Sequence, residues 1–451
     1  MEKLMICLAL GLLLCLNVAQ CIPQLQYSAT NCRRYSSSLT DFGGKGDGKT
    51  SNTAAFKTAI ANLSKLASNG GALLFVPPGK WLTGSFNLAS HFTLYIHQDA
   101  VLLASQEESD YPVIDPLPSY GKGRDGGKRY ASLITGTNLT DVVITGGNGT
   151  IDGQGEIWWK KFKSHQLNNT RPYLIEILFS NQVWDVIIEH LTIIAPVTVP
   201  NTDGINPDSC TNTRIRDSYI VSGDDCIAVK SGWDQYGIQF GIPTQNLSIT
   251  RLTCISPDSA VIALGSEMSG GIQNVRAENI YALNSQSGVR IKTAIGRGGF
   301  VKDIYVKNMN FDTIKYMFWA TGAYGSHPDP GFDPKALPTI KNINFRDVVA
   351  KNVTYVGDLS GIKGDPFTGI CISNVTAEVA EKKYTSVYYE FVEKKKTKPK
   401  LPWNCTDISG VSSRVSPKAC ELLPEKKVDC AYPEDKLAID KVELRTCSIT
   451  Y

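Results

Sequence analysis

Short runs of apolar, often β-branched residues, each broken by Gly, Asn or Asp, fill the chain from residue 71 onward. Ala72 to Val76 and Phe92 to Ile96 are examples with the length and composition of β-strands. One earlier stretch, Thr53 to Leu66, has the pattern of a helix, and long amphipathic helices are scarce after it. The pattern predicts an all-β protein with a short N-terminal capping helix.

A short phrase recurs within this β-rich region, an Asn or Asp followed by alternating apolar residues. Its copies begin at Asp141, Asp185, Asn246, Asn274, Asp303 and Asn342, with a weaker copy at Asn212. Self-similarity at intervals of about 20–50 residues is typical of repeat proteins, and short strands without helices favour a solenoid of parallel β-coils. A β-sandwich is the alternative, but it predicts hairpin turns rather than one repeated phrase.

Three aspartates stand in two turn-like motifs, Asn201-Thr202-Asp203-Gly204 and Gly223-Asp224-Asp225. Asp and Gly dominate turns, so either motif alone is compatible with loop chemistry. In a β-solenoid, however, coils stack about 4.8 Å apart, and Asp203 falls one coil before Asp224 and Asp225. We therefore expect the three carboxylates to converge. Paired carboxylates suit an enzyme that protonates a leaving group while it activates a water.

A basic pair follows in the same phase of the coils. Strand alternation puts Arg290 and Lys292 on one face of their strand, with Ile291 on the other. Arg can bind a carboxylate through two hydrogen bonds and Lys can add a point charge, so the pair indicates a sugar chain that bears carboxylates. The alternative is that Arg290 and Lys292 pair with the aspartates themselves.

Composition and motifs exclude several other classes. Hydrophobic content of 42% and charged content of 20% are those of a globular protein, and a net charge of +3 is too small to indicate nucleic-acid binding. Gly43 to Thr50 matches the phosphate-loop pattern GxxxxGK[ST], but the buried strand that this motif needs is not expected in Arg33 to Ser38. We predict no nucleotide, no other cofactor and no metal.

The N-terminus predicts secretion. A charged start, an apolar run from Leu4 to Val18 and a small-residue site at Ala19 to Cys21 are typical of a signal peptide covering residues 1–21. An N-terminal membrane anchor is the alternative. No later segment has the roughly 18 uninterrupted apolar residues of a membrane span, so no membrane contact is expected after cleavage.

Nine cysteines remain after this leader, an odd number that leaves one free thiol. Cys210 and Cys226 bracket the aspartates and could form a disulfide there, although spacing leaves the connectivity of all the cysteines open. Four more cysteines crowd the end of the chain and are expected to hold the C-terminal tail: Cys405, Cys420, Cys430 and Cys447. Eight glycosylation sequons are spread along the chain, at Asn62, Asn138, Asn148, Asn168, Asn246, Asn352, Asn374 and Asn404.

Taken together, these motifs resemble the plant polygalacturonases of glycoside hydrolase family 28 over nearly all of the mature chain. The segments that carry the resemblance are Phe42 to Gly48, Asn201 to Gly204, Gly223 to Asp225, Lys230 to Asp234 and Arg290 to Lys292. The resemblance implies a right-handed parallel β-helix of the pectin-lyase type, here residues 22–400, followed by a Cys-rich tail at residues 401–451 packed on the solenoid. It also implies hydrolysis of α-1,4-galacturonosyl links in pectin, with inversion at the anomeric carbon.

The resemblance also implies residue roles. Asp224 would be the general acid, Asp203 and Asp225 would hold and deprotonate the water, and Arg290 and Lys292 would bind galacturonate carboxylates. Inversion requires carboxylates about 6.5–9.5 Å apart. The acid must stay protonated, and a neighbouring carboxylate would raise its pKa accordingly.

The chain departs from the family in two places. Gly265-Ser266-Glu267 stands where the family has Gly-His-Gly, so Ser266 takes the place of a histidine whose role Glu267 or solvent would fill. About one coil, roughly two dozen residues, is also missing between Ser180 and Val186. We expect a secreted, monomeric cell-wall hydrolase of pectic polysaccharide, endo or exo. The alternative is a catalytically impaired β-helix that binds cell-wall polysaccharide.

Overall fold

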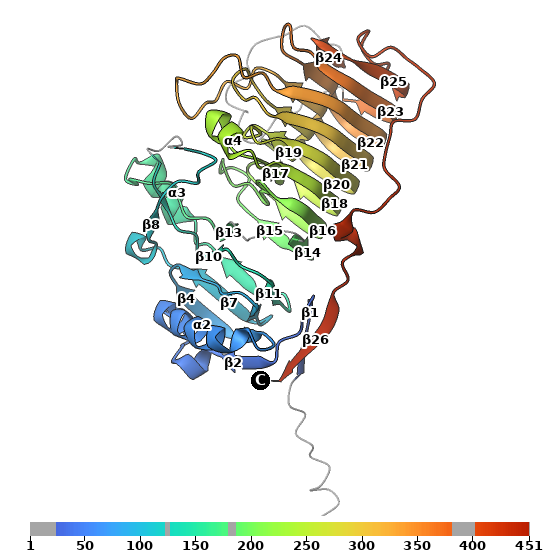
Figure 1. Cartoon of the computed structure of the whole chain (residues 1–451). Coiled ribbons are helices and arrows are strands. Elements are labelled where there is room, and N and C mark those ends of the chain that lie inside the picture. Colours follow the sequence, from blue (N-terminus) through green and yellow to red (C-terminus); the bar gives the residue numbers. More distant parts are fainter. Residues whose placement is uncertain (1–23, 122–126, 179–185, 381–401, 451) are drawn as a thin grey trace, which may run out of the picture. The chain divides into compact units, whose positions relative to one another are not determined.

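The computed structural model describes residues 24–121, 127–178, 186–380 and 402–450 (Figure 1). The predicted signal peptide lies outside these residues. The chain forms two compact units, one made of the residues up to 114 with 128–182 and 443–451, the other of residues 115–127 and 183–442. Both are built from parallel strands that pair with strands from the preceding and following coils.

The first unit contains three small parallel sheets. One holds β2 (Tyr35–Ser38), β3 (Ala72–Val76), β6 (Phe92–Ile96) and β11 (Val142–Gly146). The second holds β4 (Gly79–Thr83), β7 (Ala100–Ala104) and β12 (Thr150–Asp152), and the third β5 (Phe86–Asn87), β10 (Ile134–Thr137) and β13 (Ile175–Leu178). Two antiparallel pairs accompany them, β1 (Gln24–Ala29) with β26 (Arg445–Thr450) and β8 (Val113–Ile114) with β9 (Arg129–Tyr130).

Helices cover parts of this unit. The expected N-terminal helix is confirmed as α2 (Thr53–Ala67), which buries Phe56 and Ile60 in the same core as Trp81 of β4. The short helices are η1 (Leu39–Phe42), η2 (Glu108–Asp110) and α3 (Glu156–Lys163).

The segment that matches a phosphate loop folds against its own side chains. Contrary to expectation a strand, β2, does precede it, but this strand is only half-buried and is followed by η1. The carboxylate of Asp47 accepts the backbone N–H groups of Lys49 and Thr50 at 2.8 and 2.7 Å. A phosphate would need such N–H groups, and here the Asp47 side chain already accepts them, so the loop is a closed turn.

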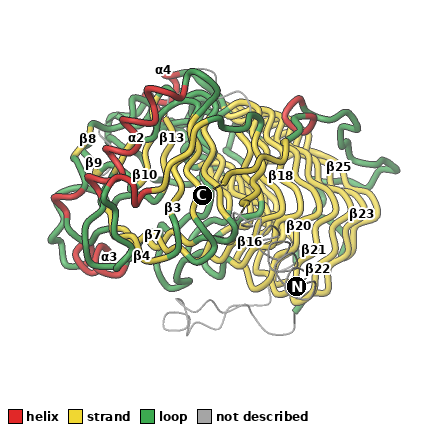
Figure 2. The backbone as a smooth tube through the Cα atoms, turned by 90° about the horizontal axis from the view of Figure 1, so that it is seen from below, coloured by secondary structure: helices red, strands yellow, loops and turns green. Residues whose placement is uncertain are grey.

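The second unit is one continuous parallel sheet system of twelve strands, seen following one another in Figure 2. The strands are β14 (Val186–Glu189), β15 (Thr192–Ile194), β16 (Thr211–Val221), β17 (Ile227–Val229), β18 (Thr244–Ile255), β19 (Ala260–Gly265), β20 (Ile272–Lys292), β21 (Phe300–Thr321), β22 (Thr339–Ser360), β23 (Phe367–Val379), β24 (Trp403–Thr406) and β25 (Ile408–Ser416). The remaining elements are α4 (Asp234–Phe240) and η3 (Ala438–Lys441). β24 and β25 pair with β22 and β23, so the coils continue past residue 400.

The repeated Asn or Asp phrase marks one corner of the coils. Its described copies adopt a left-handed backbone with φ between 50° and 57°: Asp141, Asn212, Asn246, Asn274, Asp303 and Asn342. Asn and Asp tolerate this conformation better than other residues with a side chain. The corner side chains also bond between coils, since Asn246 donates to Asn212 at 3.1 Å and Asn274 donates to Asn246 at 2.8 Å. The phrase therefore sets the register of the solenoid.

Each unit has an open sheet edge next to the place where a coil was expected to be missing. In the described part of the chain, β13 pairs only with β10, and β14 and β15 pair only with β16. These edges expose apolar side chains, including Ile177 at 42% and Ile194 at 73%. Residues 179–185, where the gap falls, lie outside the described residues.

The disulfides correct one expectation and confirm another. Cys226 bonds to Cys254 in the core rather than to Cys210, which is free and half-buried. The side chain of Cys226 points into the coil interior, where the next coil presents Cys254, whereas the Cys210 thiol lies against the Asp208 carbonyl.

The four tail cysteines are all bonded, as expected, in the pairs Cys32–Cys447, Cys371–Cys430 and Cys405–Cys420. With Cys226–Cys254 they make four disulfides among the described residues. Disulfides persist in oxidising compartments, so these bonds agree with an extracellular protein.

Candidate active site

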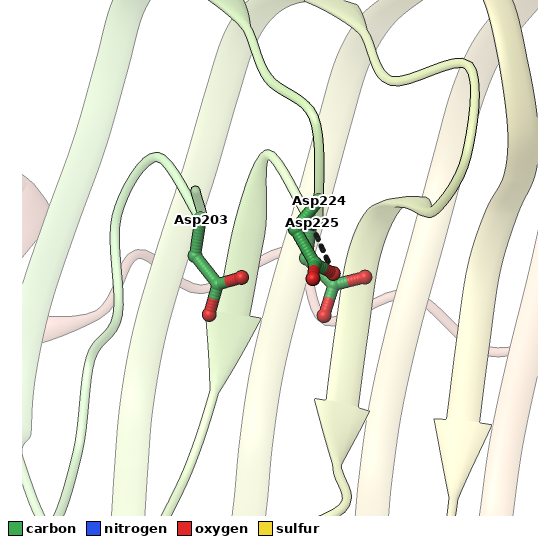
Figure 3. Close-up of side chains that lie close together, drawn as sticks. All are labelled: Asp203, Asp224 and Asp225. Carbon is green, nitrogen blue, oxygen red and sulfur yellow. Dashed lines mark hydrogen bonds between the residues drawn. The ribbon is translucent and has the colours of Figure 1, made fainter. Parts of the chain in front are cut away.

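The three predicted aspartates converge in the second unit. Asp203 lies on the segment after β15, and Asp224 and Asp225 lie in the turn between β16 and β17 (Figure 3). Gly204 N–H donates to the Asp225 carbonyl at 3.0 Å, which places the two motifs on neighbouring coils. One carboxylate oxygen from each aspartate lies within 4.8 Å of the other two. The convergence predicted from coil spacing is confirmed.

The turn that carries Asp224 leaves no room for a side chain at the preceding residue, Gly223. A Cβ atom at Gly223 would lie 2.1 Å from the Val199 carbonyl oxygen, so only glycine fits. The Asp224 carboxylate accepts the Asn201 backbone N–H at 2.9 Å and the Asp225 N–H at 3.0 Å. Burial, reinforced by the charges of Asp225 and Asp203, raises the pKa of Asp224 above its usual range.

Asp225 has the opposite environment. Its carboxylate is buried and accepts hydrogen bonds from Ser259 Oγ at 2.5 Å, Ala260 N–H at 3.0 Å and Lys292 Nζ at 2.6 Å. Burial alone would raise the pKa of Asp225, but Lys292 and the other donors outweigh it, and the pKa is lowered. The pKa values of two adjacent aspartates are thus shifted in opposite directions, as an acid and base pair requires.

A lysine that the motif analysis assigned no role holds the third aspartate. Lys230 Nζ lies 3.0 Å from the Asp203 carboxylate, and both side chains are largely buried. Coil phase could have located Lys230, because its backbone forms a parallel β-bridge with Asp208, which follows Asp203 on the preceding coil. The site therefore contains two Lys–Asp pairs that partly neutralise three carboxylates.

The basic pair of β20 divides into two environments. Ile291 is buried in the core, so Arg290 and Lys292 share the opposite face, as strand alternation predicts. For Lys292 the alternative of pairing with an aspartate is what the structure shows. Burial alone would lower the pKa of Lys292, but Asp225 more than offsets this and the pKa is raised, so the lysine stays charged.

Arg290 makes no ion pair within 4.0 Å among the residues that the structure describes. Its guanidinium carbon lies 3.6 Å from the centre of the Trp319 ring, and its Nε is buried without a hydrogen-bond partner. The charges of Asp225 and Asp224 act on it from a distance. Of the two residues expected to bind substrate carboxylates, Arg290 is the one whose donors are not already occupied by an aspartate.

Glu267 lies where the family has the second glycine of Gly-His-Gly. Its backbone carbonyl accepts the Ser231 N–H at 2.7 Å, and its side chain is half-buried. Burial alone would raise the pKa of Glu267, but Lys230 and Lys292 lower it, so Glu267 adds a negative charge to the site. The neighbouring Ser266, in the place of the histidine, is buried and carries no charge.

The nearest oxygens of the three carboxylates lie close together. One oxygen each of Asp203, Asp224 and Asp225 lies within 4.8 Å of the other two, whereas the roughly 6.5–9.5 Å of most inverting glycosidases is the separation between whole carboxyl groups. Two oxygens at this spacing can both accept hydrogen bonds from one water, since each such bond spans about 2.6–3.2 Å. Separation alone therefore does not predict the stereochemistry here.

Comparison with known proteins assigns the family. The sequence profile of the glycosyl hydrolases family 28 matches residues 176–396. A probable polygalacturonase of Vitis vinifera is 58% identical over 470 residues, covering 98% of this chain and 93% of the relative. The chain belongs to glycosyl hydrolase family 28. It is thereby a pectin-degrading hydrolase of the polygalacturonase type, and galacturonan is the substrate class that this family 28 membership implies.

More distant polygalacturonases are also similar to the chain, and two solved structures share its fold. Polygalacturonase-2 of Solanum lycopersicum is 27% identical over 376 residues, covering 75% of this chain and 74% of that protein. The crystal structure of a hyperthermoactive exopolygalacturonase from Thermotoga maritima aligns with a TM-score of 0.64 at 24% identity, covering 78% of this chain and 90% of that one. The polygalacturonase from Erwinia carotovora gives 0.56 at 21% identity, covering 78% and 94%. The predicted β-helix is confirmed.

The alignment with the Vitis vinifera protein also bears on chain length. It runs over 470 residues, more than the 451 of this chain, so that relative contains residues with no counterpart here. This agrees with a missing coil.

Proposed function

We propose that this chain hydrolyses α-1,4-galacturonosyl links of the pectin backbone with inversion, using Asp224 as general acid and Asp203 and Asp225 to activate the water. The opposite pKa shifts of Asp224 and Asp225, adjacent in sequence and in one carboxylate cluster, carry the proposal. They leave one carboxyl group with a proton to give and the other able to accept one at the same pH.

The chemical step follows from these states. Asp224 gives its proton to the glycosidic oxygen as the bond from that oxygen to the anomeric carbon breaks, with the bonding electrons going to the oxygen. A water held between Asp203 and Asp225 attacks the anomeric carbon from the opposite face and loses a proton to one of these carboxylates. The products are two shorter galacturonan chains, one with a new reducing end.

Substrate binding depends on the two cations of β20. Arg290 offers its guanidinium to the carboxylate of a galacturonate, a pairing that two parallel hydrogen bonds strengthen. Lys292 has a double role, because it holds Asp225 ionised at 2.6 Å and adds positive charge beneath the substrate. A methyl ester of galacturonate lacks the charge that both cations attract, so de-esterified pectin is the preferred substrate.

The place of action is the plant cell wall, reached by secretion. The signal-like N-terminus, eight sequons and four disulfides support this location. None of the described helices has the length and apolarity that a membrane span requires. We expect the secreted protein to act as a monomer.

The deciding experiment is a reducing-end assay on polygalacturonate with the secreted protein, followed by proton NMR of the first products. We expect new reducing ends that appear first as the β-anomer, since the α-link is cleaved with inversion. An α-anomer first would contradict inversion. Binding to polygalacturonate without any reducing ends would establish the alternative, a catalytically impaired binder, and product sizes would distinguish endo from exo action.

A pH profile tests the two aspartates. Activity requires Asp224 protonated and Asp225 ionised, and the raised pKa of Asp224 and lowered pKa of Asp225 widen the range in which both hold. Replacing Lys292 by Met removes the cation that lowers both pKa values. The acid limb and the alkaline limb of kcat/KM should therefore both move to higher pH, with lower activity throughout.

Lys351→Met is the matched control. Lys351 is exposed on β22, so its replacement removes the same charge at a position away from the site. Its pH profile should follow that of the unchanged protein. If the acid and alkaline limbs of the kcat/KM profile do not move in Lys292→Met, Lys292 does not set the protonation of Asp224 and Asp225.

A further inference from the structure

Three aromatic rings and Arg290 form a continuous stack across three strands. The rings of Tyr355 on β22 and Tyr316 on β21 are stacked at 5.0 Å and 15°, and Tyr316 is stacked on Trp319 at 4.5 Å and 26°. The guanidinium of Arg290 on β20 ends the stack, 3.6 Å above Trp319. We call Tyr355, Tyr316 and Trp319 the aromatic column.

The register of the sheet builds this column. Arg290 is the direct cross-strand partner of Trp319, and Tyr316 is the partner of Tyr355 on the next coil. Neighbouring strands lie about 4.8 Å apart, which is close to the spacing of stacked rings. Strand alignment thus sets the two contacts between strands, and the contact of Tyr316 with Trp319 lies within β21.

Without a support, Arg290 would be expected to move. Asp225 and Asp224 attract its charge, and Lys292, on the same face of β20, repels it. The Tyr324 ring lies 5.7 Å from both cations, and Tyr316 of the aromatic column also interacts with Arg290. A long flexible arginine in this field would pair with Asp224 or Asp225, as Lys292 does. The Trp319 ring offers it an alternative, because a guanidinium over an indole is attracted by the ring electrons.

We propose that the aromatic column is a positioning device, in which Trp319 holds Arg290 flat over its ring, directed to a substrate carboxylate and away from the general acid Asp224. A guanidinium stacked in this way keeps its N–H donors in the plane, at its edge, where a carboxylate can accept two of them. Trp319 then determines how strongly the site prefers free galacturonate to its methyl ester. This inference rests on the proposed function.

The test is Trp319→Leu, measured on polygalacturonate and on methyl-esterified pectin. Loss of the stacking attraction should raise KM for polygalacturonate roughly tenfold while KM for the ester changes little. Arg290, released toward Asp224, would also lower the pKa of that acid. The alkaline limb of kcat/KM should therefore move to lower pH, which a loss of packing alone would not cause. Trp319→Tyr keeps a ring and should restore both properties.

Tyr281→Leu is the control, because Tyr281 is an exposed aromatic residue on the same strand as Arg290 and lies outside the column. It should leave KM and the pH profile unchanged. A Trp319→Leu protein with unchanged KM ratio and alkaline limb would overturn the positioning role. If the unchanged protein itself releases no reducing ends, the proposed function fails, and that result is separate from the failure of this inference.

Discussion

Replacing Asp224 by Asn lowers kcat on polygalacturonate by about 10²–10⁴-fold, the usual contribution of a positioned general acid. The amide has nearly the shape of the carboxyl group, and its single oxygen can still accept one of the two N–H groups, of Asn201 or of Asp225, that the two carboxylate oxygens of Asp224 accept. It has no proton to give to the leaving oxygen. KM should change little, because Arg290 and Lys292 are untouched. Initial rates of reducing-end release across substrate concentrations measure both constants.

The same substitution should stabilise the fold at neutral pH. An aspartate whose pKa is raised in the folded state costs stability as the pH rises above its unfolded value, and the full cost is present above the folded pKa. Asn has no charge to bury beside Asp203 and Asp225. A thermal midpoint that rises while kcat falls would show that the site keeps a repulsive carboxylate for its chemistry.

Asp217→Asn is the matched control for both measurements. Asp217 lies on β16, before Asp224 in the same coil, and pairs with the half-exposed Arg251. Losing an exposed pair of this kind costs about 0–1 kcal/mol, and kcat should stay as it is. An Asp224→Asn protein with more than a tenth of the original kcat would remove Asp224 from the role of general acid.

Much of the arrangement could be predicted from the sequence because a solenoid repeats. Once the Asn and Asp corners define a coil, residues one coil apart must lie one above the other, and this alone brings Asp203 to Asp224 and Asp225. The family resemblance added roles for these residues. It did not add distances between individual carboxylate oxygens, which only the structure gives.

The contacts that could not be predicted depend on where side chains point. Coil phase puts Arg290 and Lys292 near the aspartates, but only the structure shows that Lys292 pairs with Asp225 while Arg290 stacks on Trp319. The disulfide of Cys226 with Cys254 could not be predicted for the same reason. The short sequence separation of Cys226 and Cys210 does not show whether both thiols point into the core. The repeat pattern predicts which residues are neighbours, and packing and electrostatics determine which of these neighbours form contacts.

Replacing Asp234 by Ala should destabilise the second unit by about 3–5 kcal/mol, the usual cost of breaking a buried ion pair on one side. Asp234 and Arg297 lie 2.5 Å apart, and both side chains are completely buried. His327 Nδ1 lies 2.5 Å from the other Asp234 oxygen, so the carboxylate joins two segments. Ala would leave the charge of Arg297 buried without its partner. The midpoint of urea unfolding measures the loss.

Two further variants distinguish an unpaired charge from lost packing. Asp429→Ala breaks the exposed pair with Arg414, in which the side chains are 66% and 54% exposed, and should leave the urea midpoint nearly unchanged. The double variant Asp234→Leu with Arg297→Met removes both buried charges and should recover much of the stability lost in Asp234→Ala. A double variant as unstable as the single one would show that packing, not charge, is lost.

The Asp234 pair also connects stability to activity. Arg297 donates a hydrogen bond to the Ser326 carbonyl, on the segment that carries Tyr324. Tyr324 lies 5.7 Å from both Arg290 and Lys292, so releasing this segment disturbs the surroundings of the two substrate-binding cations. Asp234→Ala should therefore raise KM for polygalacturonate at temperatures well below its unfolding midpoint. The double variant also lacks the Arg297 hydrogen bond to Ser326, so it should recover stability without recovering KM. Recovery of both would place the whole effect of Asp234 in the stability of the fold.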